Sequence, residues 1–203
     1  LEASFVPRRE DLIAGSPILG AIVPSTVPLS GRALATFMIV NSDNTATNLL
    51  IERYGMARLN QLVARLGVPS IQWRRKMLDL AAVRRGEENT ATPRALSELL
   101  LKLHRGELAG HAEFFRILGQ PKLTYIGTEL SEDVPLFNKT GSLAGVIAET
   151  CVVRLAQRPF VLSVMTSFSG DAHAAERLLA KLGLLAYRAF ERLDGSSPLG
   201  RRL

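Results

Sequence analysis

The sequence predicts an α+β fold in which helices come first, strands follow and one long helix closes the chain. Apolar residues recur at helical spacing in the first part of the chain. From Val134, three strand-length segments rich in Val, Ile and Phe replace that pattern, and an amphipathic helical pattern then returns. We therefore expect one domain over residues 1–203, with a mostly helical lobe over 30–130 and a lobe of antiparallel sheet plus C-terminal helix over 131–203.

The first helices are predicted from their start and end signals. Residues 1–29 are expected to be irregular, because proline and glycine recur through them. Ser30 is suited to capping a helix, and apolar residues follow it at helical spacing. Second and third helices are expected at about 45–54 and 57–66, since each of these stretches ends at a glycine.

A long loop is predicted at residues 68–91, where charges are many and periodicity is weak. Thr92 and Pro93 form a helix start, with the threonine as N-cap and the proline at the first helical position. That helix is expected to end near Gly106, and a shorter one is expected at 111–118.

The three predicted strands lie in V-P-L-F-N-K-T-G, G-V-I-A-E-T-C-V-V-R-L and R-P-F-V-L-S-V-M-T-S, with the last two joined as a hairpin. The segment K-T-G is expected to end the first strand. The closing helix is predicted at 172–193, with its apolar residues on one face: Leu178, Leu179, Leu182, Leu185 and Ala186.

Composition argues against several classes of protein. No apolar stretch approaches the roughly 18 residues that a membrane-spanning helix needs. The net charge of +6 invites a nucleic-acid interpretation, but the basic residues are scattered in pairs and no nucleic-acid-binding motif is present. We therefore expect neither a membrane span nor a nucleic-acid partner.

Cysteine and histidine give no sign of a disulfide or a metal site. Cys151 is the single cysteine, and its apolar surroundings predict a buried small hydrophobe. His104, His111 and His173 match no metal-ligand spacing, so we expect no metal and no cofactor.

Two short motifs carry the chemistry. S-D-N stands at Ser42–Asn44 between two predicted helices, and K-T-G stands at Lys139–Gly141 in a predicted strand. Each alone has a plain structural alternative, an interhelical cap for S-D-N and a strand-to-turn signal for K-T-G. Together they are the pair found in class A β-lactamases and penicillin-binding proteins.

The chain closely resembles the class A β-lactamase family of serine hydrolases. The segment S-D-N-T-A-T-N-L-L, the Thr92-Pro93 helix start, K-T-G and the terminal helix occur in the family's order over nearly the whole chain. The resemblance implies the serine β-lactamase/DD-peptidase-like fold, with a cleft between the two lobes. It also implies a small-molecule substrate, a β-lactam or related acyl compound, and export to the periplasm or the medium.

The resemblance assigns roles to the first motif. Ser42 would relay a proton to the leaving nitrogen, a task that suits a hydroxyl because it donates and accepts at once. Asn44 would bind the amide of the substrate's acyl side chain. Asp43 is expected to be structural, holding the turn together.

The second motif would bind and polarise the substrate. Lys139 would hold the relay serine and attract the substrate's carboxylate, with help from the Thr140 hydroxyl. Gly141 would let the ligand lie along the strand edge. The backbone N–H of Ser142 would be one of two oxyanion donors. We therefore assign Ser42, Lys139 and Ser142 to catalysis and Asn44, Thr140 and Gly141 to substrate binding.

One departure from the family pattern concerns the nucleophile, which lies in S-x-x-K upstream of S-D-N. None of the five lysines has a serine three residues before it. We therefore expect that the sequence lacks an N-terminal portion of the family domain and that this chain alone does not acylate.

A second departure concerns deacylation. The family carries E-x-x-L-N in the long loop, and counting back from Pro93 places Lys76 at the glutamate's position. Asp79 is the nearest carboxylate, but it is expected to cap a helix or to pair with Arg75 or Arg84 rather than to act as the base. Slow deacylation is the expected result.

These departures leave alternatives open. A D-alanyl-D-alanine peptidase or esterase on the same scaffold is one, and a non-catalytic ligand-binding remnant is another. Without upstream strands, the strand at 160–166 would be an unpaired apolar edge, so we expect poor solubility or dimerisation through that edge.

Overall fold

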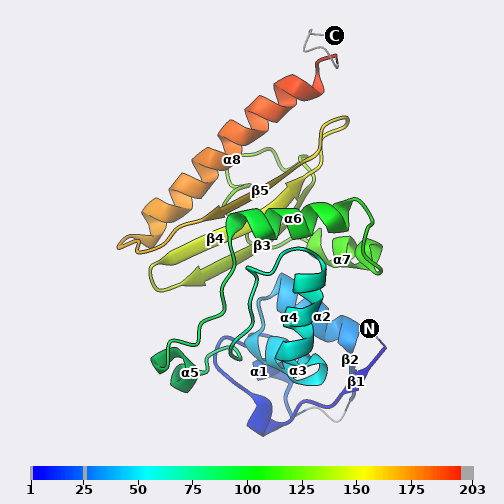
Figure 1. Ribbon diagram of the computed structural model, residues 1–203, viewed down its shortest axis with the longest axis vertical. Coiled ribbons are helices and arrows are strands. Elements are labelled where there is room, and N and C mark those ends of the chain that lie inside the picture. The colour runs from blue at the N-terminus through cyan, green and yellow to red at the C-terminus, as the bar shows by residue number, and fades with distance from the viewer. Residues whose placement is uncertain (1, 25–26, 198–203) are drawn as a thin grey trace. The chain divides into compact units, whose positions relative to one another are not determined.

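Helices make up most of the first half of the chain and an antiparallel sheet lies in the second half, as the order of sequence patterns predicts (Figure 1). The computed structural model describes residues 2–24 and 27–197. The chain divides into two compact units, Leu1–Ala95 and Leu96–Leu203. The predicted lobe boundary at residue 130 falls inside the second unit, where the Phe115 ring packs edge-on against Phe137 of the sheet at 5.5 Å.

The first unit begins with short elements, in keeping with its prolines and glycines. Strand β1 (Ser4–Phe5) pairs antiparallel with β2 (Leu29–Ser30), and between them lie a 3-10 turn, η1 (Arg9–Asp11), and helix α1 (Leu19–Ile22). The longer helices then follow as predicted: α2 (Gly31–Val40), α3 (Asn44–Tyr54) and α4 (Met56–Arg65), with the short α5 (Leu80–Arg84) inside the long loop.

The core of the first unit joins α1, α2 and α3. Leu19, Leu34 and Ala46 are fully buried there, and Leu50 is nearly so. The Ser30 hydroxyl accepts the Ala33 N–H at 3.1 Å, which confirms the predicted cap of α2. This packing fixes the turn between α2 and α3, where S-D-N lies.

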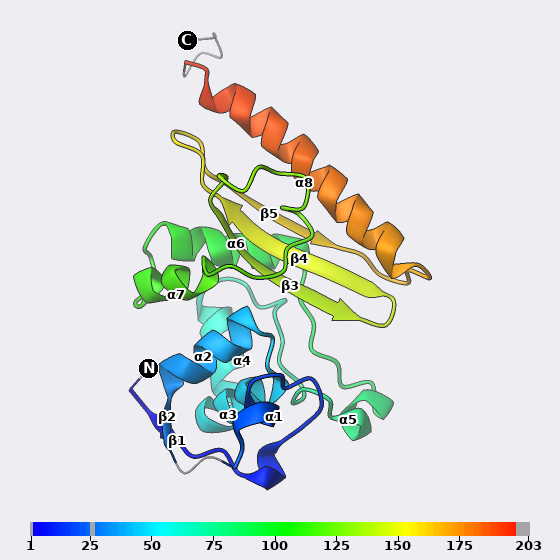
Figure 2. The same cartoon turned by 180° about the vertical axis from the view of Figure 1, so that it is seen from behind.

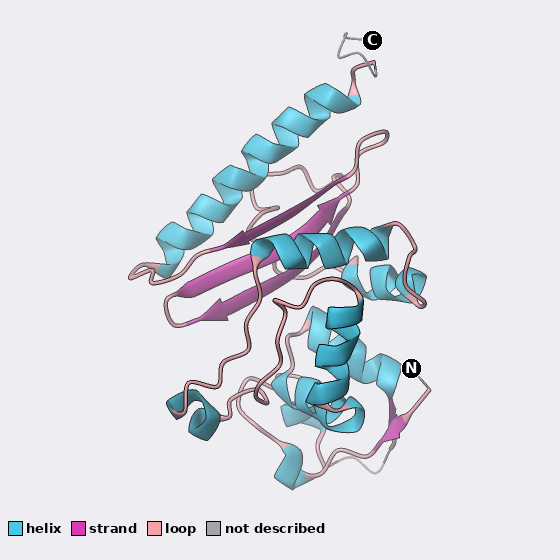
Figure 3. Ribbon diagram, in the orientation of Figure 1, coloured by secondary structure: helices cyan, strands magenta, loops and turns pink. Residues whose placement is uncertain are grey.

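The second unit is a three-stranded sheet with helices on both faces (Figure 2). Helices α6 (Pro93–His104) and α7 (His111–Leu118) precede it, and the Ser97 hydroxyl of α6 donates to Ser163 of the sheet at 2.8 Å. The strands β3 (Leu136–Leu143), β4 (Val146–Val153) and β5 (Phe160–Met165) are antiparallel in the order β3-β4-β5 (Figure 3). Helix α8 (Ala172–Asp194) covers the face opposite α6 and α7.

K-T-G lies within β3 rather than at its end, which corrects the prediction. Lys139 pairs with Thr150 and Gly141 with Ala148, and the strand continues to Leu143 before it turns. The ladder extends further because both strands keep pairing up to the tight turn at Gly145, which has a φ of 74°.

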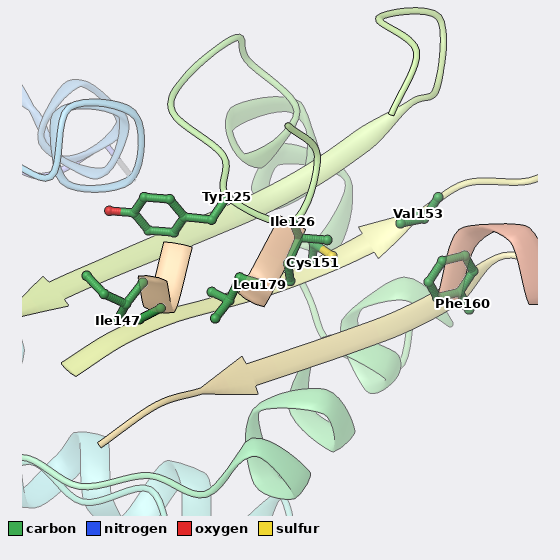
Figure 4. Close-up of a cluster of buried hydrophobic side chains, with 8 residues drawn as sticks. Tyr125, Ile126, Ile147, Cys151, Val153, Phe160 and Leu179 are labelled. Carbon is green, nitrogen blue, oxygen red and sulfur yellow. The ribbon is translucent and has the colours of Figure 1, made fainter. Parts of the chain in front are cut away.

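The core of the second unit lies between α8 and the sheet. Tyr125, Ile126 and Leu179 pack over Ile147 and Cys151 of β4 (Figure 4). A Cβ at Gly183 of α8 would lie 2.2 Å from the Ile126 carbonyl oxygen, so only glycine permits this close approach. Cys151 has no exposed surface, which confirms the prediction of a buried small hydrophobe.

Helix α8 does not have the single apolar face that was predicted. Leu179 and Ala186 pack on the sheet, whereas Leu178, Leu182 and Leu185 are 47%, 37% and 62% exposed. Since these three recur at helical spacing, they form a second apolar stripe beside the packed one. Within the described residues, no helix combines the length and the apolar character that crossing a bilayer requires.

Candidate active site

The S-D-N turn presents Ser42 at the surface in a conformation that few residues adopt. Its φ is 53°, in the left-handed region that is uncommon outside glycine. The N–H groups of Asn41 and Asp43 both donate to the Phe37 carbonyl at 3.1 Å, which closes the chain tightly after α2. Ser42 is exposed, while Asp43 beside it is fully buried.

Asp43 holds this turn together. One carboxylate oxygen accepts the Ala46 N–H at 2.9 Å and so caps α3, and the other accepts the N–H groups of Ile18 and Leu19 at 3.0 and 2.9 Å. The carboxylate thus joins two segments far apart in sequence and sets the conformation of Ser42 before it. The predicted structural role of Asp43 is in agreement with these contacts.

Asn44 begins α3, and its side chain is fixed by the loop before α1. The amide Nδ2 donates to the Ala14 carbonyl at 3.0 Å, and the backbone N–H donates to Gly15 at 3.1 Å. A Cβ at Gly15 would lie 2.5 Å from that Nδ2, so the loop needs a glycine there. These contacts give the Asn44 amide one defined orientation.

The K-T-G strand places its residues on alternating faces of the sheet. Lys139 lies on the same face as Phe137, and its Nζ donates to the Thr140 carbonyl at 2.7 Å. Burial lowers the pKa of Lys139, and the negative charge of Glu149 partly opposes that change. Gly141 and Ser142 continue the strand at its exposed end.

Ser142 contacts the segment that leads into the sheet. Burial mainly, and also Glu176 and Glu149, raise the pKa of Tyr125, and the nearby Ser142 side chain opposes this rise. In the β3–β4 ladder Ser142 faces Ile147.

Glu149 of β4 was not singled out from the sequence, although it stabilises the segment next to K-T-G. It is 1% exposed, and its carboxylate accepts the N–H groups of Tyr125 and Ile126, both at 2.7 Å. The Thr124 hydroxyl and the Asn138 amide donate to its other oxygen. A single carboxylate in the apolar segment G-V-I-A-E-T-C-V-V was the available signal.

Lys122 is a second lysine near Lys139 that the sequence did not indicate. Its ammonium donates to the carbonyl of Leu118 and to that of Gln120. Burial lowers its pKa to about 8, and the positive charge of Lys139 acts in the same direction, while Glu149 opposes it.

The long loop at 68–91 contains no carboxylate that is free to activate water. Asp79 caps α5 by accepting the Ala82 N–H at 2.9 Å, in agreement with one of its two predicted roles. The other two acids form ion pairs at 2.7 Å, Glu87 with Arg85 and Glu88 with Arg75. Lys76 itself pairs with Glu52 at 2.8 Å and thereby lowers the pKa of that glutamate.

Three asparagines hold the loop's backbone, and the sequence did not reveal their role. Asn48 of α3 binds both the N–H and the carbonyl of Met77, at 2.7 and 3.2 Å. Asn60 of α4 binds Trp73 in the same two-fold way, each contact 2.8 Å. Asn89 accepts the N–H groups of Arg74 and Arg75.

The structure thus brings the predicted residues together in two groups. Ser42 and Asn44 are neighbours on the turn of the first unit, and Lys139, Thr140, Gly141 and Ser142 follow one another on a strand of the second. In the part of the chain that the structure describes, no group of three metal-ligating side chains is close enough to hold an ion.

Comparison with known proteins identifies the family. A profile of the β-lactamase enzyme family matches residues 1–190. This chain belongs to the β-lactamase enzyme family. The predicted resemblance and the predicted α+β fold are confirmed, and membership supports a β-lactamase-like serine hydrolase. No curated protein matches the chain closely enough to count as a relative.

Solved structures of β-lactamases superpose well on this one. The β-lactamase of Sphaerobacter thermophilus DSM 20745 is 28% identical with a TM-score of 0.83, over 93% of this chain and 73% of that one. An ancestral (GNCA) class A β-lactamase is 27% identical with a TM-score of 0.83, over 94% and 76%. PBP-A, 24% identical with a TM-score of 0.80 over 94% and 72%, shares the fold.

Proposed function

We propose that this chain carries the proton-relay and substrate-binding part of a serine hydrolase that opens β-lactams through an acyl-enzyme. In this proposal Ser42 passes a proton to the leaving nitrogen and Asn44 binds the acyl side chain. Lys139 and Thr140 bind the substrate's carboxylate, Gly141 admits the ligand to the strand edge, and Ser142 donates its N–H to the oxyanion.

The observation that carries the proposal is the construction of the S-D-N turn. Backbone strain at an exposed serine persists only where the surrounding contacts enforce it, and such strain is concentrated at functional sites. Here a fully buried carboxylate with three N–H donors enforces the conformation of Ser42. An ordinary interhelical turn needs no such arrangement, because a glycine would adopt this φ without strain.

The lowered pKa of Lys139 fits its proposed role. A lysine that takes part in proton transfer releases and accepts a proton more readily near neutral pH when its pKa falls toward that range. Its cationic form would attract a substrate carboxylate.

The printed residues contain no S-x-x-K, so we propose that the 203-residue chain does not form an acyl-enzyme by itself. The hydrolase activity is assigned to the product of the complete reading frame that contains this chain. By analogy with the family, we propose that this product is exported to the periplasm or the medium.

A penicillin-binding peptidase or esterase that deacylates slowly is the second candidate. The observation in its favour is the loop at 68–91, in which all three carboxylates are held by loop partners and Lys76 is in an ion pair. With no base in this loop to activate water, the acyl-enzyme would persist.

The test is nitrocefin turnover by the complete gene product, combined with mass spectrometry of the protein after mixing. We expect acylation, and we expect Lys139→Ala to slow it by about a hundredfold or more, because a charged group that acts in the transition state is lost. Lys181→Ala, on the exposed surface of α8, is the matched control and should behave as wild type.

Three outcomes separate the candidates. Steady turnover supports the β-lactamase, and a stoichiometric burst without turnover supports the slowly deacylating enzyme. If the complete product is never acylated by nitrocefin or by penicillin, the catalytic proposal fails and a ligand-binding remnant is favoured.

A further inference from the structure

A pocket in the sheet unit shares no lining residue with the proposed active site. It has a volume of about 440 Å³ and is formed by the end of α6, by α7, by β3 and by the residue after β4. That volume falls within the range typical of small-ligand sites. Its lining residues are His104, His111, Ala112, Phe115, Arg116, Phe137 and Arg154.

Aromatic rings form the apolar part of this pocket. Phe115 meets Phe137 edge-on at 5.5 Å, and the His104 ring meets Phe115 edge-on at 5.8 Å. Phe115 is only 8% exposed, so the ring is held by packing. This wall would offer a flat ligand ring the offset or edge-on contacts that aromatic groups prefer.

Positive charge dominates the polar part. The Arg154 guanidinium lies over the Phe137 ring, 4.4 Å from its centre, and across the described residues no carboxylate forms an ion pair with it. Arg116 is paired with Glu113 through two contacts of 2.8 and 2.7 Å, so that glutamate is already engaged. Arg154 therefore adds a net positive charge at the pocket.

The stacking of the Arg154 guanidinium on the Phe137 ring determines which kind of anion it can bind. With one face of the guanidinium on a ring, its N–H groups still point outward in the plane, where a carboxylate can accept two parallel hydrogen bonds. The aromatic wall beside it favours a ligand whose carboxylate is attached to a flat ring. A small inorganic anion would leave that wall without a contact.

We propose that this pocket binds an aromatic carboxylate, with the carboxylate on Arg154 and the ring against Phe115 and Phe137. His104 and His111 line the same pocket and can donate to the carboxylate as well. This proposal does not rest on the proposed hydrolase activity, since the pocket and the proposed active site share no residue.

Two of the chain's three histidines line the pocket, so their NMR signals can report a ligand bound there while the third histidine serves as a reference. Benzoate is titrated into the 203-residue chain while the imidazole proton signals are followed by NMR. We expect the His104 and His111 signals to move and the His173 signal, on α8, to stay. Benzamide, a neutral molecule of the same shape, and acetate, which has no ring, are titrated in parallel.

Arg154→Gln should weaken benzoate binding by about tenfold or more, because a hydrogen-bonded charge pair is lost. Arg188→Gln, which removes an exposed guanidinium on α8, is the matched control and should leave the affinity unchanged. The proposal is overturned if benzamide or acetate shifts the two signals as strongly as benzoate. It is also overturned if benzoate moves none of them up to its solubility limit, or if the Arg154 variant binds as well as wild type.

Discussion

Adjacent residues of the S-D-N segment have opposite surroundings. Ser42 is exposed and held at a φ of 53°, whereas Asp43 has no exposed surface and accepts three backbone N–H groups. A carboxylate can accept this many bonds because its two oxygens carry about four lone-pair sites. The Asp43 carboxylate therefore holds the turn together, and Ser42 lies at its exposed surface.

Replacement of Asp43 by alanine should strongly destabilise the first unit. It would leave three buried N–H groups without an acceptor, so we expect a loss of about 3–5 kcal/mol in the free energy of unfolding. Urea unfolding followed by the fluorescence of Trp73, the single tryptophan, reports this unit. Asp79→Ala, which removes only one capping bond, is the control with an expected loss of about 1 kcal/mol. Equal small losses in both variants would contradict the role given to Asp43.

The lowered pKa of Lys122 predicts a pH dependence of stability. Between about pH 8 and the ordinary lysine pKa of about 10.4, the unfolded chain binds this proton and the folded chain does not. The unfolded state then binds more protons, so stability contributed by Lys122 rises with pH through this window. Below about pH 8 both states are protonated and the burial of the charge opposes folding.

The variant Lys122→Met should therefore show a flatter rise in stability than wild type over that window. Urea unfolding followed by far-ultraviolet circular dichroism at several pH values measures the difference. Lys181→Met, at an exposed position of α8, should keep the wild-type slope. Identical slopes in all three proteins would refute the assignment.

At the scale of elements, the loop at 68–91 is ordered although it has little regular structure. Asn48 of α3 and Asn60 of α4 each bind a backbone N–H and a backbone carbonyl of the loop. Asn89, which belongs to the loop itself, binds the loop backbone in the same way. These amides replace the hydrogen bonds that a helix or a sheet would have supplied.

Removal of the Asn48 side chain should loosen the loop without unfolding the first unit. We expect Asn48→Ala to increase tryptic cleavage at the basic run Arg74–Lys76 several-fold, because the backbone of Met77 loses two partners. Peptide mapping after brief digestion locates the cut. Gln61→Ala, at an exposed position of α4, serves as the control. Cleavage at the same rate in both variants would contradict the role given to Asn48.

The sequence predicted those features that depend on near neighbours. The caps Ser30 and Thr92 act three residues away, and their helices begin where expected. The three strands and their hairpin also followed from local pattern. The hydrogen bonds between Asn48 and Met77 were not predicted, because the two residues are 29 positions apart and a single amide gives no periodic signal. The second stripe of α8 was missed since apolar spacing does not tell which leucines are packed.

The candidate site was predictable to a similar extent. The motifs singled out Ser42, Asn44 and Lys139, because these residue types at these positions define the resemblance, and the roles of the three residues stay predictions. Lys122 and Glu149 were not found, since their effect on the site depends on burial and on partners in other elements. The register that places K-T-G inside β3 likewise depends on pairing with β4.

At the scale of the whole molecule, the sheet unit exposes surfaces that favour self-association. No described strand pairs with the outer edge of β5, and unpaired edges are prone to pairing between chains. The exposed stripe of Leu178, Leu182 and Leu185 on α8 adds apolar surface in the same unit.

We expect the 203-residue chain to form dimers or larger species as its concentration rises. Size-exclusion chromatography with light scattering across a concentration series measures this. Leu185→Lys should reduce association, whereas Leu62→Lys, at a 43%-exposed leucine of α4, should not. A monodisperse monomer at every concentration would contradict the prediction.

The buried thiol of Cys151 in β4 can also report how often the sheet around it opens. Cys151 has no exposed surface and burial raises its pKa, so a maleimide reacts with it only when the strand around it opens. The single tryptophan lies in the other unit, so each half of the chain has one natural reporter. The rate of thiol labelling, compared with the rate of fluorescence change in the same denaturant, would measure whether the two halves open as one event or as two.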